Sequence, residues 1–141
     1  MKVTELRIGN YAFDSDRNDP YFYQIVRIET KEYTEWNSGD KFNVIGKIEG
    51  SENGYYEMNP SPIPLTEEWL ERFGFEKTYS ELSYCEYDLG KIGVEINSDK
   101  LTVSYNYGSD VEWVNFNHIK HVHQLQNLYH ALTGEELTIK E

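Results

Sequence analysis

The sequence predicts an α+β protein with a β-rich N-terminal half and a C-terminal half that combines helices with an antiparallel sheet. Three observations carry this prediction. Short runs that alternate between apolar and polar residues recur between turn residues, three of the four prolines fall together in residues 60–64, and residues 119–133 repeat apolar side chains at helical spacing. A chain of 141 residues suits one domain or two very small ones that share a core.

The N-terminal half, residues 1–59, contains several strand signals. Residues 21–29 alternate strictly, with Tyr23 and Ile25 on one side and Phe22 and Gln24 on the other. Further strands are expected between turn signals. Four or five short strands with tight turns predict a small SH3-like barrel or a bent β-sheet. The further strands are residues 33–36, 42–48 and 55–58, and the turns are residues 9–10, 37–40 and 50–54.

A stiff proline connector, residues 60–65, is expected to separate the two halves, because proline is excluded from helix interiors and central strands. The C-terminal half, residues 66–141, begins with a short helix. Thr66 is a suitable N-cap, two glutamates follow in the first turn, and Gly74 is placed to end the helix in a left-handed conformation. We expect the two halves to pack as one unit.

An antiparallel meander should follow this helix, with strands at residues 81–88, 92–97, 100–107 and 111–116. Alternation gives it one apolar face, which needs a cover. The amphipathic helix expected over residues 119–133 provides one: Val122, Leu125 and Leu128 share its apolar side, and Gly134 closes it. Leu125→Asp would therefore bury an unpaired charge.

The charge balance restricts the partners. With 25 acidic and 13 basic residues, the formal net charge is −12, which opposes direct nucleic-acid binding and favours a partner with a basic surface. Cys85 is the only cysteine, so no intramolecular disulfide can form. No apolar run reaches the ~20 residues of a membrane span. We therefore expect a cytoplasmic protein without membrane contact.

No pattern predicts catalysis or a cofactor. The chain lacks a nucleophile elbow and a phosphate-binding glycine loop, so we expect no enzyme and no catalytic residue. His118, His121 and His123 have spacing that invites a zinc hypothesis, but they cross a helix start and lack a completing ligand, so no metal is expected. Asp14, Asp16 and Asn18 resemble the start of a calcium loop without its later ligands, and are expected to form an acidic turn.

Binding is the remaining interpretation, with two candidate surfaces. One is a polar stripe on the last helix that offers both hydrogen-bond donors and acceptors. The other consists of strand aromatics, since aromatic rings serve interfaces at low entropic cost. The predicted ligand- or partner-binding residues are His123, Gln124, Asn127, His130, Tyr105, Tyr107 and Trp113.

Three blocks of the chain resemble one family: ELRIGNY at residues 5–11, PIPLTEEWL at residues 62–70 with FGF at 73–75, and VHQLQNLY at residues 122–129 with ALTGEEL at 131–137. The family consists of uncharacterised small proteins from gut-type bacteria, their phages and mobile elements. The resemblance implies a phage or mobile-element accessory protein that acts in the cytoplasm of a bacterial host cell, a class that often inhibits host enzymes or host defence. It implies no activity, cofactor or catalytic residue.

Three functions follow as hypotheses. The first is a non-catalytic, acidic inhibitor that binds the basic surface of a host protein, such as a defence protein. The second is an anti-defence sponge that sequesters a small nucleotide-like signalling ligand, and the third is an unrecognised enzyme. The sequence is also compatible with a homo-oligomer. The net charge favours the protein partner.

Overall fold

The structure is a computed structural model, which describes residues 1–18, 21–30, 42–48, 54–98, 100–108 and 112–141. Within these residues the chain forms two five-stranded antiparallel sheets and two α-helices, which confirms the predicted α+β class. The chain divides into two compact units, Met1–Ile63 and Pro64–Glu141, and the division falls within the proline-rich segment. The strand expected at residues 33–36 and the turn at 37–40 lie outside the described residues.

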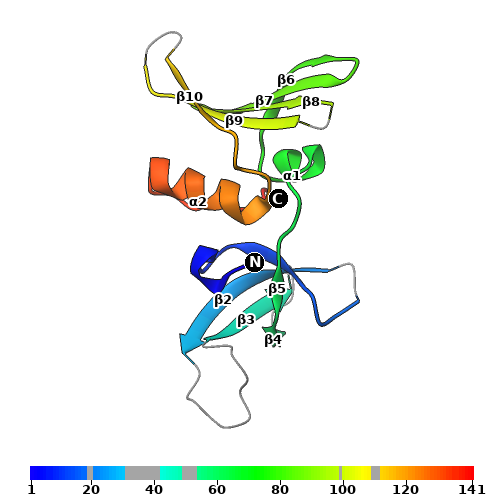
Figure 1. Cartoon of the computed structure of the whole chain (residues 1–141), viewed down its shortest axis with the longest axis vertical. Helices are drawn as coiled ribbons and strands as arrows, with labels where there is room; N and C mark the ends of the chain where they lie inside the picture. Colours follow the sequence, from blue (N-terminus) through cyan, green and yellow to red (C-terminus); the bar gives the residue numbers. More distant parts are fainter. Residues whose placement is uncertain (19–20, 31–41, 49–53, 99, 109–111) are drawn as a thin grey trace. The chain divides into compact units, whose positions relative to one another are not determined.

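The first unit is a bent sheet with the strand order β4-β3-β2-β1-β5 (Figure 1). Its fifth strand returns to pair with the first, and a bulge between Ile25 and Arg27 bends the long second strand, so the sheet curls into a half-barrel, as the bent-sheet prediction has it. The elements are a short 3-10 helix η1 (Val3–Glu5), β1 (Tyr11–Asp14), β2 (Phe22–Thr30), β3 (Phe42–Ile48), β4 (Tyr55–Met58) and β5 (Pro60–Ser61).

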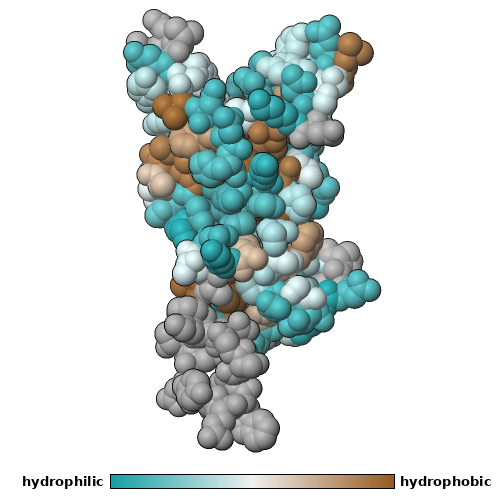
Figure 2. Space-filling model, viewed as in Figure 1, coloured by the Kyte–Doolittle hydropathy of each residue, from teal (hydrophilic) through white to brown (hydrophobic). Residues whose placement is uncertain are grey.

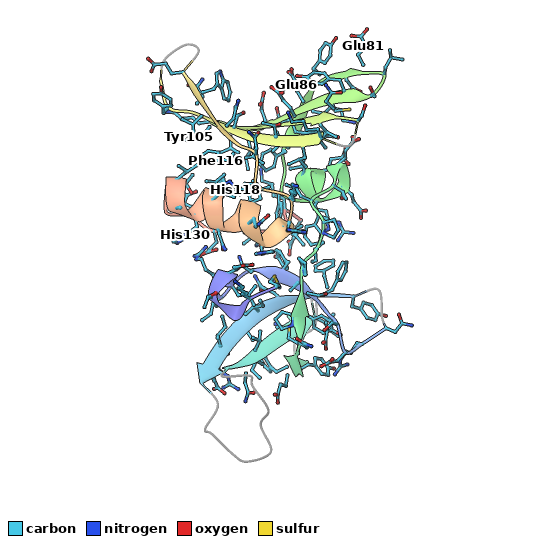
Figure 3. The ribbon with its side chains drawn as sticks, in the orientation of Figure 1. Glu81, Glu86, Tyr105, Phe116, His118 and His130 are labelled. Atoms are coloured by element: carbon cyan, nitrogen blue, oxygen red, sulfur yellow. The ribbon has the colours of Figure 1, made fainter. Side chains whose placement is uncertain are left out.

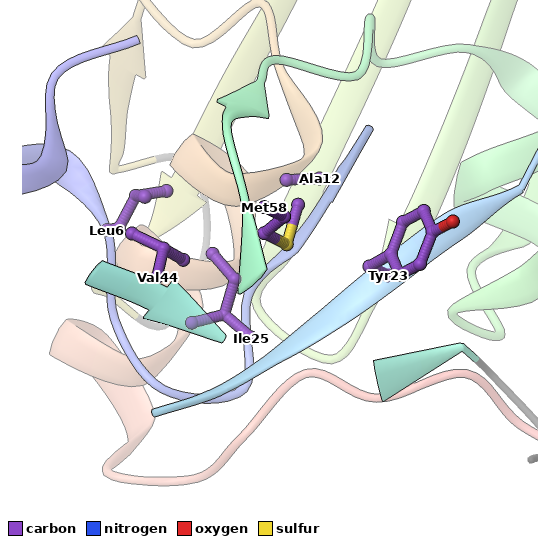
Figure 4. Packing of buried hydrophobic residues seen from close by; sticks show 6 residues of the cluster. All are labelled: Leu6, Ala12, Tyr23, Ile25, Val44 and Met58. Atoms are coloured by element: carbon purple, nitrogen blue, oxygen red, sulfur yellow. The ribbon is translucent and has the colours of Figure 1, made fainter. Parts of the chain in front are cut away.

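The core of this unit is a small cluster of buried side chains inside the bent sheet (Figure 4). Beside it, Asp14 is 5% exposed and has a structural task. Its Oδ1 atom accepts hydrogen bonds from the backbone N–H groups of Asp16 and Asn59, each at 3.1 Å. Its Oδ2 atom lies 3.2 Å from the guanidinium of Arg17. Asp14 therefore fixes an acidic turn against Asn59, the residue between β4 and β5.

The second unit contains α1 (Glu67–Arg72), β6 (Glu76–Glu81), β7 (Tyr84–Leu89), β8 (Ile92–Asn97), β9 (Lys100–Asn106), β10 (Trp113–Phe116) and α2 (Val122–Thr133). The five strands form a meander with neighbours in chain order. Both helices lie on the same side of the curved sheet, and the two ends of the sheet rise away from them (Figure 1). As predicted, Gly74 (φ 81°) and Gly134 (φ 76°) follow the helices in left-handed conformations.

One expectation for the meander is wrong. Residues 81–88 are not a single strand, because a two-residue turn at Leu82 and Ser83 ends β6 and begins β7. Every residue of β6 is exposed, so that strand has no apolar alternation that could mark it in the sequence. Leu82 also adopts a φ of 48°, a conformation that favours glycine and that a leucine does not signal.

The helix-side face of the second sheet is apolar. Val94 pairs with Tyr87 on one side and Val103 on the other, and all three side chains are at most 1% exposed. From helix α2, Leu125 is completely buried, as the predicted apolar stripe requires. Burial of side chains of this size stabilises the unit by about 2 kcal/mol each. This packing leaves the other face of the sheet without a helical cover.

Candidate functional site: an acidic concave face

The uncovered face of the second sheet carries the side chains that alternate with the core. Strand register places Asp88, Gly93, Ser104 and Asn115 in one row across four strands, from β7 to β10. Two residues along the strands, Glu86 pairs with Glu95 in a second row. We call this surface the concave face and define it by Glu86, Asp88, Gly93, Glu95, Ser104, Trp113 and Asn115.

The concave face encloses a hollow of about 400 Å³. Figure 2 shows the surface hollowed between the two raised ends of the second sheet, with hydrophilic residues along much of the opening. In Figure 3, Glu86 lies on this open side, whereas Tyr105 and Phe116 lie toward helix α2. The described lining residues are Glu86, Asp88, Gly93, Val94, Glu95, Ser104, Trp113 and Asn115.

Gly93 forms the floor of the hollow because it has no side chain. A Cβ atom placed on Gly93 would lie 3.0 Å from Ser104 Oγ, 3.1 Å from Asp88 Oδ1 and 3.5 Å from Trp113 Cζ3. A carboxylate, a hydroxyl and an indole edge thus converge on the space that a side chain would otherwise fill. Glycine inside a strand marks such points of close approach.

Trp113 forms an aromatic wall. Trp113 is the first residue of β10, and its ring reaches the space above Gly93 on β8, so the indole extends across β9. The side chain remains 45% exposed, and its ring is available to a ligand in the hollow. The negative face of an indole attracts cations, which complements carboxylates in the same site.

The electrostatics of the hollow are acidic. Its described lining includes three carboxylates, Glu86, Asp88 and Glu95, and no basic side chain. Glu86 accepts a hydrogen bond from the Tyr84 hydroxyl, and this bond raises the pKa of Tyr84 to about 12. Phosphate groups would be repelled here, whereas ammonium and guanidinium groups would be attracted.

A second, more open hollow of about 460 Å³ lies beside the turn between β6 and β7. The rings of Tyr79 and Tyr84 meet edge to face there, with centroids 5.8 Å apart. Leu82 projects fully into solvent at the turn, and Glu86 lines both hollows. The acidic face therefore continues into an aromatic and apolar hairpin tip.

The three predicted aromatic residues have different positions. Trp113 lines the hollow. Tyr105 pairs with Ile92 and Val114 on the helix-side face, so it is not on the concave face. Tyr107 is 57% exposed and lies just beyond the end of β9. The fold thus brings only Trp113 of this group to the hollow.

The predicted helix stripe is largely engaged in folding. The prediction that His123 lies on the exposed polar side of α2 is wrong. His123 is 2% exposed, because other parts of the protein cover the helix beyond its apolar stripe.

The other three residues of the predicted stripe have different positions. Gln124 Oε1 accepts hydrogen bonds from the backbone N–H groups of Lys120 at 2.9 Å and His121 at 3.1 Å, so Gln124 caps the helix. His130 Nε2 lies 3.6 Å from Glu136 Oε1. Asn127 is half-buried.

The histidines and Cys85 are the side chains that the sequence offers for metal binding and nucleophilic chemistry. No three His, Cys, Asp or Glu side chains are grouped there as metal ligands. The rings of His121 and His123 stack with centroids 5.8 Å apart, which is an aromatic contact. The half-buried Cys85 thiol lies 3.5 Å from the Ser80 hydroxyl, which is a weak partner and no general base.

Most residues of the concave face were not singled out from the sequence. Glu86, Asp88 and Glu95 alternate with apolar residues on predicted strands. Residues between the apolar positions of a strand lie on the opposite face of the sheet, and this rule would have indicated all three. Gly93 had a weaker signal, an isolated glycine within a strand.

Comparison of the chain with family models, with curated proteins and with solved structures finds no match. None of the described helices is both long and apolar enough to cross a membrane.

Proposed function

We propose that this protein is a non-catalytic binding protein that holds a basic segment of a partner protein on its concave face. The observation that carries the proposal is the hollow itself, in which three carboxylates and an indole ring converge without a basic side chain among the described lining residues. Charge complementarity of this kind steers association and selects the partner.

The proposal favours a protein partner over a nucleotide-like ligand. A nucleotide pocket would combine aromatic rings with basic groups for phosphate, whereas here the ring of Trp113 stands among acids. The sequence resembles phage and mobile-element proteins, so the proposal extends to a host protein in the bacterial cytoplasm as the partner. Binding of this protein would block the function of that host protein. Inhibition of a defence protein is one form of this function.

A defined basic probe tests the proposal. An eight-residue peptide of alternating lysine and glycine would be titrated into the isotope-labelled chain, and backbone amide shifts would be followed by NMR. We expect shifts concentrated on β7 to β10, and affinity that falls as salt rises. The variant Glu86→Gln/Asp88→Asn/Glu95→Gln should weaken binding about tenfold or more, since three charges near the ligand are lost.

A matched control separates a built site from general attraction to an acidic protein. Asp16→Asn/Glu135→Gln/Glu141→Gln removes the same charge from exposed acids outside the sheet. We expect this control to bind nearly as the parent does. Equal weakening in both triple variants, or shifts spread over the whole chain, would refute the concave face as the binding site.

A further inference from the structure

We infer that the floor of the hollow, above Gly93, receives the guanidinium group of an arginine side chain from the partner. This inference rests on the proposed function and names the group that the concave face recognises. It commits to arginine rather than to basic residues in general, and three features of the site support that choice.

The first feature is the space. Gly93 is paired with Asp88 on one strand and Ser104 on the next, so side chains flank the glycine on both sides. The position of its absent Cβ atom lies 3.0–3.5 Å from a hydroxyl oxygen, a carboxylate oxygen and an indole carbon. The hollow of about 400 Å³ above this point has room for a planar group, and a methyl group on Gly93 would project into its floor.

The second feature is the set of acceptors. Asp88 Oδ1 is oriented toward the gap, and Ser104 Oγ, in a residue only 8% exposed, borders it from the opposite side. The Ser104 hydroxyl donates to the Gly93 carbonyl at 3.4 Å, so its lone pairs remain to accept a further hydrogen bond. Guanidinium offers five N–H donors spread in one plane, which reach acceptors on two sides at once.

The third feature is the indole. Trp113 approaches the gap from two strands away, and its ring supplies a flat apolar surface beside the acceptors. Guanidinium is planar and weakly hydrated, so it stacks on an aromatic ring while its edge donates to carboxylates. The ammonium group of lysine is compact and strongly hydrated, and it uses such a surface less well. Glu86 and Glu95 then attract the basic residues that flank the arginine.

The experiment compares three peptides on the full chain by NMR titration. They have eight residues and alternate glycine with arginine, lysine or citrulline, the last being a neutral analogue of arginine. We expect the arginine peptide to bind about fivefold or more tightly than the lysine peptide. The citrulline peptide should show no measurable binding, because the charge is lost.

Two variants locate this preference. Gly93→Ala adds one methyl group at a backbone position outside the left-handed region, and the Ser104 and Asp88 side chains must shift slightly to admit it. The arginine preference should vanish while lysine-peptide affinity changes little. Trp113→Leu should also abolish the preference, by removing the stacking surface. Because Trp113 is 45% exposed, this variant should fold, and it tests the inference even if Gly93→Ala does not fold. Asn97→Ala, on an exposed position of the same strand, is the control and should keep the preference.

The outcomes separate the two proposals. Equal affinity for arginine and lysine peptides in the parent chain, with binding still on the concave face, overturns the arginine inference and leaves the proposed function standing. Retention of the preference in either Gly93→Ala or Trp113→Leu also overturns the inference. Absence of binding by every basic peptide overturns both.

Discussion

Leu82 should make the folded protein less stable than glycine would at the same position. It is the first residue of the two-residue turn between Glu81 and Tyr84, with φ 48°, and its neighbour Ser83 is not in the left-handed region. A turn with this pattern normally takes glycine first. The Leu82 side chain is 102% exposed, so it contributes no buried area that could offset the strain.

The expected magnitude follows from two opposing effects. A left-handed conformation costs a residue with a Cβ atom about 1–2 kcal/mol. Glycine relieves that cost but gives the unfolded chain more freedom, which costs about 0.5–1 kcal/mol. Leu82→Gly should therefore raise the free energy of unfolding of the second unit by about 0.5–1 kcal/mol. Urea denaturation measures this, with the fluorescence of Trp69, 7% exposed in the same unit, as a reporter.

Gly90→Ala is the matched control, with the opposite expected sign. Gly90 is the first residue of the two-residue turn between β7 and β8, with φ 61°, and no atom lies within 4 Å of a Cβ placed there, so only conformational strain is added. It should lose about 1 kcal/mol. Destabilisation of Leu82→Gly by more than about 0.5 kcal/mol would refute the reasoning. Stabilisation by about 0.5–1 kcal/mol would confirm that the turn conformation of Leu82 lowers fold stability.

Three further predictions concern packing, a helix end and pH. Leu125→Asp should lower the melting temperature strongly or prevent folding, because it buries an unpaired charge against the sheet; a melt like that of the parent would contradict the packing. Gly134→Val should cost about 1–2 kcal/mol in chemical denaturation, since φ is 76° and no crowding complicates the result; an unchanged midpoint would place the helix end elsewhere. Tyr87 donates a hydrogen bond to Glu67 and lowers the pKa of that carboxyl below 4.5, so the bond stabilises the fold above that pH and its contribution is lost as the pH falls through the lower folded pKa. Tyr87→Phe should therefore cost more stability at about pH 6 than at about pH 3, and an equal cost at both would exclude this linkage.

Much of the fold was predictable because its signals are local. The glycines after both helices, Gly74 and Gly134, act through their own backbone conformation, and the apolar stripe of α2 follows from spacing alone. Strand β6 was missed because all its side chains face solvent, so only tertiary pairing with β7 defines it. Leu82 was missed as a turn residue because leucine opposes the conformation that the hairpin imposes.

The site was predictable in part, for different reasons. Trp113, which lines the hollow, was proposed from its residue type, since an aromatic ring on a strand suggests an interface. His123 was assigned to the polar surface of α2 because a helical wheel ranks polarity and does not count the elements that surround a helix; its neighbours bury it. The convergence on Gly93 depends on the register of four strands, which no single stretch of sequence specifies.

The covering of the second sheet by α2 has a consequence for how the protein is made. All five strands of that sheet precede α2 in the chain, so during synthesis the apolar face formed around Val94 and Val103 emerges before the helix that shields it. Exposed apolar sheet surface promotes aggregation of nascent chains. Fragments that end before residue 122 should therefore be captured by chaperones or precipitate, whereas the described core cluster of the first unit comes from residues within that unit.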